Sequence, residues 1–257
     1  MACIILEEPA TLARIEPLLR DDLPCDRHAG YPDFLSPELR EHFRIVDTEA
    51  VSSNDYDHHG LELIERHTDG LILDCGAGRR AVYFDNVVNF EIAPYDTTDV
   101  RGVGEELPFR DASFDAVISI AVLEHVKDPF RCAREIARVL KPGGELICAV
   151  PFLQPYHGYP HHYYNMTHQG LSNLFDATLK IDRIEVYDHV LPIWALAWIA
   201  QSLAEGLEGA TREKFLDLQL RDLLQPPKSF LPRSLMKELS REKNLELACA
   251  CVLFARK

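Results

Sequence analysis

The chain has 257 residues, of which 27 are basic and 41 acidic, so its formal net charge is −14 at pH 7. Its 47% hydrophobic and 26% charged residues are typical of a soluble globular protein, and no apolar run is long enough to predict a membrane-spanning helix. The acidic balance disfavours nucleic acid as a partner because it repels phosphate backbones, and the N-terminal segment turns acidic too early for a secretory signal peptide.

In chain order, the sequence predicts an N-terminal extension at residues 1–52, followed by a domain at residues 53–257. A capped amphipathic helix is expected from Ser53, because serine, asparagine and aspartate there can accept hydrogen bonds from the first helical turn. The predicted strands are 71–78, which runs into a glycine turn, then 87–92, 114–120, 144–152, 180–188 and 245–256.

Helices are expected between several of these strands. Residues 128–140 have apolar residues at helical spacing and end at a Lys-Pro-Gly-Gly turn, and residues 167–175 form a helix with Thr167 as N-cap. Strands that alternate with helices predict an α/β protein with a Rossmann-like, doubly wound and mostly parallel sheet. Residues 189–245 interrupt this pattern as a helical insertion before the last strand.

The seven cysteines carry no recognisable site. Their number is odd, and no pair has the C-x₂-C spacing of a zinc or redox site. We therefore expect reduced thiols in a cytoplasmic protein.

The glycine turn is the first feature with chemical content. Gly76 and Gly78 follow a strand, and glycine lets the backbone approach a ligand so that its amides meet ligand oxygens. Alone this signal is weak, because a glycine pair is also common in simple turns. Glu91 ends the next strand, where a carboxylate either binds both ribose hydroxyls of a nucleotide or is merely solvated.

Five motifs in order make the signal specific. They are LDCGAG at 73–78, EELPF at 105–109, FDAVIS at 114–119, VLEHVKDP at 122–129 and REIARVLKPGG at 134–144. Together they closely resemble the class I S-adenosylmethionine-dependent methyltransferases, in the small-molecule branch that includes the ubiquinone and menaquinone biosynthetic enzymes. The resemblance covers about a third of the chain, residues 71–152.

The resemblance implies a class I methyltransferase fold, S-adenosylmethionine as the methyl donor, and roles for individual residues. Asp74, Gly76 and Gly78 match the motif that holds the methionine part of the donor, and Glu91 matches the ribose-binding acid. The remaining matches are Glu105 and Leu107 in the segment that lines the adenine pocket, and Ile120 beside the sulfonium.

Two spacings depart from the family pattern. Gly78 and Glu91 are 13 residues apart, whereas the usual fingerprint reaches its acid after about 20 and leaves room for a helix. Only 14 residues then separate Glu91 from Glu105, and the intervening APYDTTDV is a poor helix former. We therefore expect both early crossover helices to be shortened or lost.

A histidine-rich segment follows the predicted strand at 144–152. It holds His157, His161, His162 and His168 among tyrosines. A metal site is disfavoured because no acidic or cysteine ligand in the segment completes a familiar set, so no metal is predicted. The alternatives are a loop of packing histidines or a general base, since imidazole titrates near neutrality. We name His161, His162 and also His125 as candidate bases.

The apolar segment 190–207, with Trp194 and Trp198 on one helix face, admits several roles. It could be buried against the core, cover an acceptor pocket or form a dimer face. Stable membrane insertion is disfavoured because nearby charges, such as Glu205 and Glu208, are acidic.

The sequence thus predicts a cytoplasmic enzyme that transfers a methyl group from S-adenosylmethionine to a small-molecule or glycan-like acceptor. Its expected partners are that acceptor and, as an open alternative, a second copy in a homodimer, but not nucleic acid. The alternative function is a non-catalytic, methyltransferase-like module that binds a ligand or a protein through a degenerate donor site.

Overall fold

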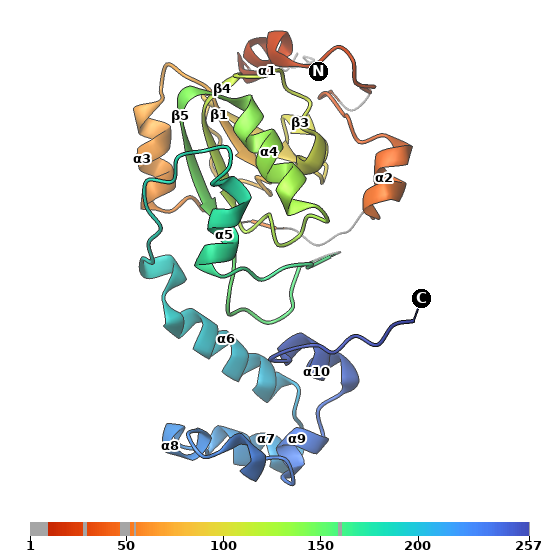
Figure 1. Cartoon of the computed structure of the whole chain (residues 1–257), viewed down its shortest axis with the longest axis vertical. Helices are drawn as coiled ribbons and strands as arrows, with labels where there is room; N and C mark the ends of the chain where they lie inside the picture. Colours follow the sequence, from red (N-terminus) through yellow and green to blue (C-terminus); the bar gives the residue numbers. More distant parts are fainter. Residues whose placement is uncertain (1–9, 28–29, 47–51, 54, 159–160, 257) are drawn as a thin grey trace, which may run out of the picture. The chain divides into compact units, whose positions relative to one another are not determined.

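The computed structural model describes residues 10–27, 30–46, 52–53, 55–158 and 161–256. The chain divides into two compact units (Figure 1). The first unit comprises Met1–Phe152 and Gly158–Ile184, and the second comprises Leu153–His157 and Glu185–Lys257. The predicted division at residue 53 stays a prediction, and the described part of the preceding extension contributes Ile15, Leu19 and Phe34 to the main core.

The first unit contains a five-stranded, all-parallel sheet in the order β3-β2-β1-β4-β5. Its strands are β1 (Ile72–Cys75), β2 (Val87–Glu91), β3 (Val100–Arg101), β4 (Phe114–Ile120) and β5 (Leu140–Ala149). β1 lies in the middle, and the chain reverses direction across the sheet between β3 and β4. This order confirms the predicted Rossmann-like, doubly wound sheet, and it places a topological switch point between β1 and β4.

Helices cover both faces of this sheet. Alternate residues of β1 point to opposite faces, so Leu73 lies in the larger core with α4 (Pro129–Val139), whereas Ile72 packs in a smaller cluster with α3 (His58–Arg66). A strand covered on both faces favours a largely apolar run, which is the pattern of β1 and β4 apart from Asp74, Asp115 and Ser119.

Side-chain caps set the starts of these helices. Asp57 accepts a hydrogen bond from the Gly60 amide at 2.8 Å, so the helix expected from Ser53 begins at His58. Asp128 caps α4. Thr167 caps α5 (His168–Phe175), as predicted. The remaining helical pieces of this unit are α1 (Ala10–Ile15), η1 (Glu16–Leu18), α2 (Pro37–Phe43) and η2 (Gly104–Glu106).

The early crossovers contain no helix, as the short spacings predict: neither residues 79–86 nor residues 93–99 are helical. Polar contacts hold these two loops together instead. The Arg80 amide donates to Thr97 Oγ1 at 3.1 Å, and the Asn89 side-chain amide donates to the Thr97 carbonyl at 2.9 Å.

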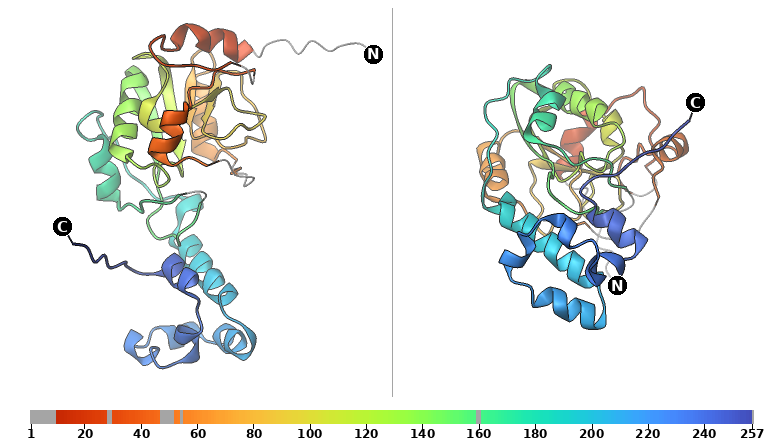
Figure 2. Two further views of the ribbon diagram at one scale, coloured as in Figure 1. Left: turned by 90° about the vertical axis from the view of Figure 1, so that its right-hand side faces the viewer. Right: turned by 60° about the horizontal axis from the view of Figure 1, so that its bottom comes forward.

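The regular elements among the described residues of the second unit are all helices (Figure 2). It consists of η3 (Asp188–Val190), α6 (Pro192–Glu205), α7 (Gly209–Leu216), α8 (Leu220–Leu223), η4 (Pro227–Ser229), α9 (Ser234–Lys237) and α10 (Arg241–Leu247). Leu207, Phe215 and Phe230 belong to its own small core. The apolar helix predicted at 190–207 is therefore present, and its role as lid, dimer face or core element stays a prediction.

Two predicted strands are wrong. Residues 180–188 form no strand, because Ile184 and Val186 remain exposed and pair with no neighbouring strand. Residues 245–256 begin inside α10 and continue without a strand. Ser240 caps α10 through the Lys243 amide at 3.0 Å, and Lys243 pairs with Glu246 at 2.7 Å, so local helix signals outweigh the apolar run.

The predictions of no membrane-spanning helix and of reduced cysteines can be compared with the structure only within the described residues. There, no helix is long and apolar enough to cross a membrane. Six cysteines are free thiols, and Cys3 lies outside the described residues.

Candidate functional site

The turn after β1 needs glycine at two positions. Gly76 has φ +83°, and a Cβ on it would lie 2.5 Å from a methyl carbon of Val122. Gly78 has φ +64°, and a Cβ there would lie 2.7 Å from the Ser52 carbonyl oxygen. Both the left-handed backbone and the close neighbours exclude a side chain. The predicted glycine motif is thus a tightly covered turn at the carboxyl end of the central strand.

Glu91, at the end of β2, reaches this turn. Its buried carboxylate accepts hydrogen bonds from the Gly78 amide at 2.7 Å, the Ile92 amide at 2.8 Å and the Ala93 amide at 3.2 Å. Burial raises the pKa of Glu91, and the three amide donors oppose that rise. The structure therefore brings together the predicted ribose acid and the predicted glycine turn.

Asp74 is paired inside the protein. It is 1% exposed, and its Oδ2 lies 2.7 Å from an Arg80 guanidinium nitrogen. Tyr56 donates a hydrogen bond to the same oxygen, and the Arg80 guanidinium lies 4.0 Å above the Tyr56 ring. The sequence analysis did not predict a role for Arg80. A basic residue two positions after the glycine pair, close to a buried strand aspartate, was the available signal.

Glu105 and Leu107 have contacts of their own within the protein. Glu105 accepts hydrogen bonds from the amides of Lys127 at 3.0 Å and Asp128 at 3.3 Å, just before α4. Leu107 is fully buried, and its amide donates to Glu135 at 2.9 Å. The predicted contact of these two residues with the adenine of a donor stays a prediction.

A tight turn follows β4 and leads away from Ile120, which is partly buried. Ala121 has φ +56°, and its amide donates to the Ala149 carbonyl at 2.9 Å. The His125 amide then donates to the Val122 carbonyl at 2.9 Å. This turn carries Val122 over the glycine turn, and Glu124 and His125 follow it at the same edge of the sheet.

The three candidate bases lie close together. His125 Nδ1 is 2.7 Å from the His161 carbonyl oxygen, and the His125 and His162 rings are 5.6 Å apart at 66°. His161 Nε2 contacts the Arg44 carbonyl at 2.8 Å, and His162 Nε2 contacts the Asn165 side-chain oxygen at 2.8 Å. His157 belongs to the second unit, where its ring lies 4.9 Å from that of Trp198.

Glu124 is a second residue that the sequence analysis did not predict. Its side chain is 0% exposed, and neither carboxylate oxygen has a hydrogen-bond partner among the described residues. Burial raises its pKa to about 7. Only its position next to His125 in the LEHV motif could have drawn attention to it.

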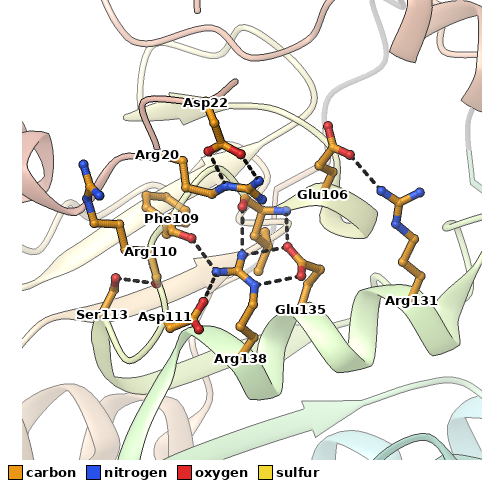
Figure 3. A network of polar contacts seen from close by, with 11 residues as sticks. Arg20, Asp22, Glu106, Phe109, Arg110, Asp111, Ser113, Arg131, Glu135 and Arg138 are labelled. Atoms are coloured by element: carbon orange, nitrogen blue, oxygen red, sulfur yellow. Dashed lines mark hydrogen bonds and ion pairs between the residues drawn. The ribbon is translucent and has the colours of Figure 1, made fainter. Parts of the chain in front are cut away.

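A hollow of about 570 Å³ lies at the opposite end of the sheet. It is lined by Arg20, Arg110, Asp111, Glu135 and Arg138 (Figure 3). Arg110 and Asp111 lie just before β4, and Glu135 and Arg138 lie on α4 before β5, whereas the glycine turn follows β1 and Glu91 ends β2. The Arg20 amide joins the first group through the Pro108 carbonyl at 2.9 Å. The arginines are paired with acids: Arg20 with Asp22, Arg110 with Asp21, and Arg138 with Glu135 and Asp111. The hollow therefore presents no unneutralised positive charge to an anion.

Comparisons with known proteins identify similarity to methyltransferases. The profile of a family described as "Methyltransferase domain" matches residues 73–148. The ubiquinone/menaquinone biosynthesis C-methyltransferase UbiE of Bartonella tribocorum is 30% identical over 115 residues, which are 45% of this chain and 44% of that protein. An S-adenosylmethionine-dependent methyltransferase, assigned as probable in Mycolicibacterium smegmatis, is 36% identical over 32% of this chain and 34% of its own length.

These curated relatives match only part of the chain. The chain spans about half or less of the length of these curated relatives, including the uncharacterised protein MJ1123 of Methanocaldococcus jannaschii, of which it covers 49% at 33% identity. Among solved structures, the YcgJ protein of Bacillus subtilis is 19% identical, with 62% of this chain and 88% of that chain covered and a TM-score of 0.38.

Proposed function

On the premise that residues 73–148 form a methyltransferase domain of the class I S-adenosylmethionine-dependent family, we propose that the protein transfers a methyl group from S-adenosylmethionine to a small-molecule or glycan-like acceptor. The acceptor atom is an oxygen, nitrogen or carbon. The proposal includes a cytoplasmic location and no role for nucleic acid, which a net charge of −14 disfavours. A homodimer is a further proposal about partners.

The contact between Glu91 and the Gly78 amide carries this proposal. It joins the ends of β1 and β2 at the carboxyl edge of a parallel sheet, where open α/β sheets bind ligands. A carboxylate there can accept hydrogen bonds from both ribose hydroxyls, and glycine amides can meet the oxygens of the methionine part once the contacts of Val122 and Ser52 with the turn are displaced. The types of these residues therefore fit the donor.

Beyond binding the donor, the protein has to align the acceptor atom with the methyl group of the donor. A sulfonium donor supplies a methyl group that is already activated by positive charge. The turn after β4 then has to orient donor and acceptor for an in-line displacement and to exclude water. For an oxygen or nitrogen acceptor that carries a proton, the histidines beside this turn, His125, His161 and His162, are the proposed bases.

One observation favours the alternative of a non-catalytic binding module. The polar groups of the site are satisfied internally, since the Gly78 amide is bound to Glu91, the Arg79 amide to the Ser52 carbonyl at 2.7 Å, and Asp74 to Arg80. A donor that needs the Arg79 amide must displace Ser52. A degenerate site would keep these contacts and bind no donor.

Calorimetric titration of the full chain with S-adenosylmethionine and S-adenosylhomocysteine separates these functions. We expect both compounds to bind the wild type, and Glu91→Ala to weaken binding at least about tenfold, equivalent to about 1.4 kcal/mol. Glu62→Ala, which removes an exposed carboxylate from α3, is the matched control and should bind as the wild type does. No heat and no thermal shift at millimolar donor would reject the enzyme and support the binding module.

A further inference from the structure

Glu124 is buried without a hydrogen-bond donor. Its side chain is 0% exposed and both carboxylate oxygens lack a hydrogen bond among the described residues. An ionised carboxylate in such a place is unfavourable unless a cation or a proton accompanies it. A fold that only needed to fill this volume would use an apolar side chain, so Glu124 indicates a role that depends on its charge or its proton.

The chain holds Glu124 in this position from both sides. Its own carbonyl accepts hydrogen bonds from the Tyr163 amide at 2.7 Å and the Tyr164 amide at 3.2 Å. The turn that begins at Val122, which lies over Gly76, fixes its other side. The carboxylate therefore lies beside the proposed donor site without reaching solvent.

His125 is the titratable group next to Glu124. Its Nδ1 lies 2.7 Å from the His161 carbonyl oxygen, and a carbonyl can only accept, so Nδ1 carries the hydrogen. Nε2 then carries the lone pair of the neutral ring, and it lies 3.7 Å from Glu124 Oε1. This separation is too long for a hydrogen bond but short enough for strong attraction once the ring is protonated.

The two side chains differ in their access to ligands. The His125 side chain is 31% exposed, whereas that of Glu124 is 0% exposed. The other titratable groups that face the pair within the first unit are His162, whose ring lies 5.6 Å from that of His125, and the Cys148 thiol, whose pKa burial and Glu124 both raise. His161 faces the pair through its carbonyl. None of these groups supplies a fixed positive charge.

We propose that His125 and Glu124 form a proton-accepting pair, in which His125 takes a proton from an O–H or N–H acceptor and Glu124 is the positioning residue that stabilises the protonated ring. This deepens the proposed methyl transfer and rests on it. It restricts the acceptor to a hydroxyl, phenol or amine-type compound, because such acceptors must lose a proton during or after transfer.

The step balances without a further reactant. A lone pair of the acceptor oxygen or nitrogen forms the bond to the methyl carbon as the carbon–sulfur bond breaks, and the electron pair of that bond stays on sulfur. The proton of the acceptor passes to His125 Nε2, and the new imidazolium is paired with the Glu124 carboxylate. A buried carboxylate that stabilises an imidazolium is the arrangement of a Ser-His-Asp triad, transferred here to a different reaction.

The test measures the pair without donor or acceptor, so its failure is distinct from that of the proposed function. Ring ¹⁵N NMR of the full chain, with His125 assigned through His125→Gln, gives the pH midpoint of its titration. We expect Glu124→Gln to lower the proton affinity of His125 about tenfold, because the stabilising carboxylate is lost. Glu62→Gln, the exposed control on α3, should leave the midpoint unchanged.

A second variant covers the case in which Glu124→Gln does not fold. In that case Glu124→Met, which has similar volume and no charge, should give the same shift. A midpoint for His125 that is the same with and without the Glu124 carboxylate overturns the proposal. So does a wild-type spectrum in which Nδ1 of the neutral ring carries no proton, since Nε2 would then be unable to accept one.

Discussion

The amide of Gly78 donates a hydrogen bond of 2.7 Å to the carboxylate of Glu91, 13 residues further along the chain. The contact links the carboxyl ends of two adjacent parallel strands, β1 and β2. It also explains how the turn keeps its shape although the crossover between these strands has no helix. The same carboxylate thus has a structural contact and a proposed ligand contact.

Replacing Gly78 by alanine should destabilise the protein through both backbone strain and crowding. The strain of a left-handed backbone accounts for about 1 kcal/mol, and the new Cβ, 2.7 Å from the Ser52 carbonyl oxygen, adds to it. Gly143 is the matched control, because it has φ +82° but no atom within 4 Å of its ideal Cβ. Urea denaturation should show a larger loss for Gly78→Ala than for Gly143→Ala. Equal losses would mean that Ser52 does not restrict the turn.

Replacing Arg80 by methionine should leave Asp74 buried without its counter-ion. The two side chains are 7% and 1% exposed, so the loss of one partner should cost about 3–5 kcal/mol in the free energy of unfolding. The double variant Arg80→Met, Asp74→Asn should recover much of this loss, because a neutral amide is less costly to bury than a carboxylate. A single variant as stable as the wild type would show that this ion pair contributes little.

Glu124 should make stability depend on pH in a defined direction. Its pKa rises from 4.5 to about 7 on folding, so the folded state favours the protonated form. The associated stability is fully present below pH 4.5 and is lost as the pH rises through about 7, a loss of about 3 kcal/mol. Glu124→Gln lacks this loss.

We therefore expect Glu124→Gln to match the wild type in acid and to exceed it in melting temperature above about pH 7. Thermal melts of both proteins between these limits are the measurement. If removing the Glu124 carboxylate stabilises the fold but lowers the proton affinity of His125, then Glu124 serves function rather than stability. Lower stability of the variant at every pH would contradict the buried, unpartnered carboxylate.

Arg138 should matter for stability but not for donor binding. Its guanidinium donates to the carbonyls of Leu107 and Phe109 and to the carboxylates of Glu135 and Asp111, at 2.7–3.0 Å. Lysine cannot reproduce this planar set, so Arg138→Lys should lose about 2 kcal/mol of unfolding free energy. Calorimetry should give an unchanged affinity for S-adenosylhomocysteine, because this network lies at the far end of the sheet. A marked loss of affinity would place the donor elsewhere.

The sequence predicted four of the five strands of the central sheet and missed the two-residue β3, and the well-predicted β1, β2 and β4 are almost entirely buried. Largely apolar runs such as Phe114–Ile120 leave few alternatives, and Thr167 was recognised as an N-cap. The loss of the early crossover helices followed from counting residues between Gly78 and Glu91, since a helix cannot fit there.

The wrong and missing predictions concern residues whose structure is determined by tertiary contacts rather than by local sequence. Residues 180–188 alternate as a strand does, but alternation cannot supply a neighbouring strand. Likewise, a basic residue near the glycine pair is a weak signal that does not establish the pairing of Arg80 with Asp74, and no local pattern indicates that Glu124 is buried. Both facts depend on segments distant in the sequence: Tyr56 contacts Asp74, and Tyr163 and Tyr164 bind the Glu124 backbone.

A crystal structure of the protein with S-adenosylhomocysteine tests the central proposal most directly. The account predicts that the ribose hydroxyls lie within hydrogen-bonding distance of the Glu91 carboxylate, with the methionine part against Gly76 and Gly78. Density for the compound at another place, or an unchanged Gly78–Glu91 contact with no compound bound at saturating concentration, would contradict it.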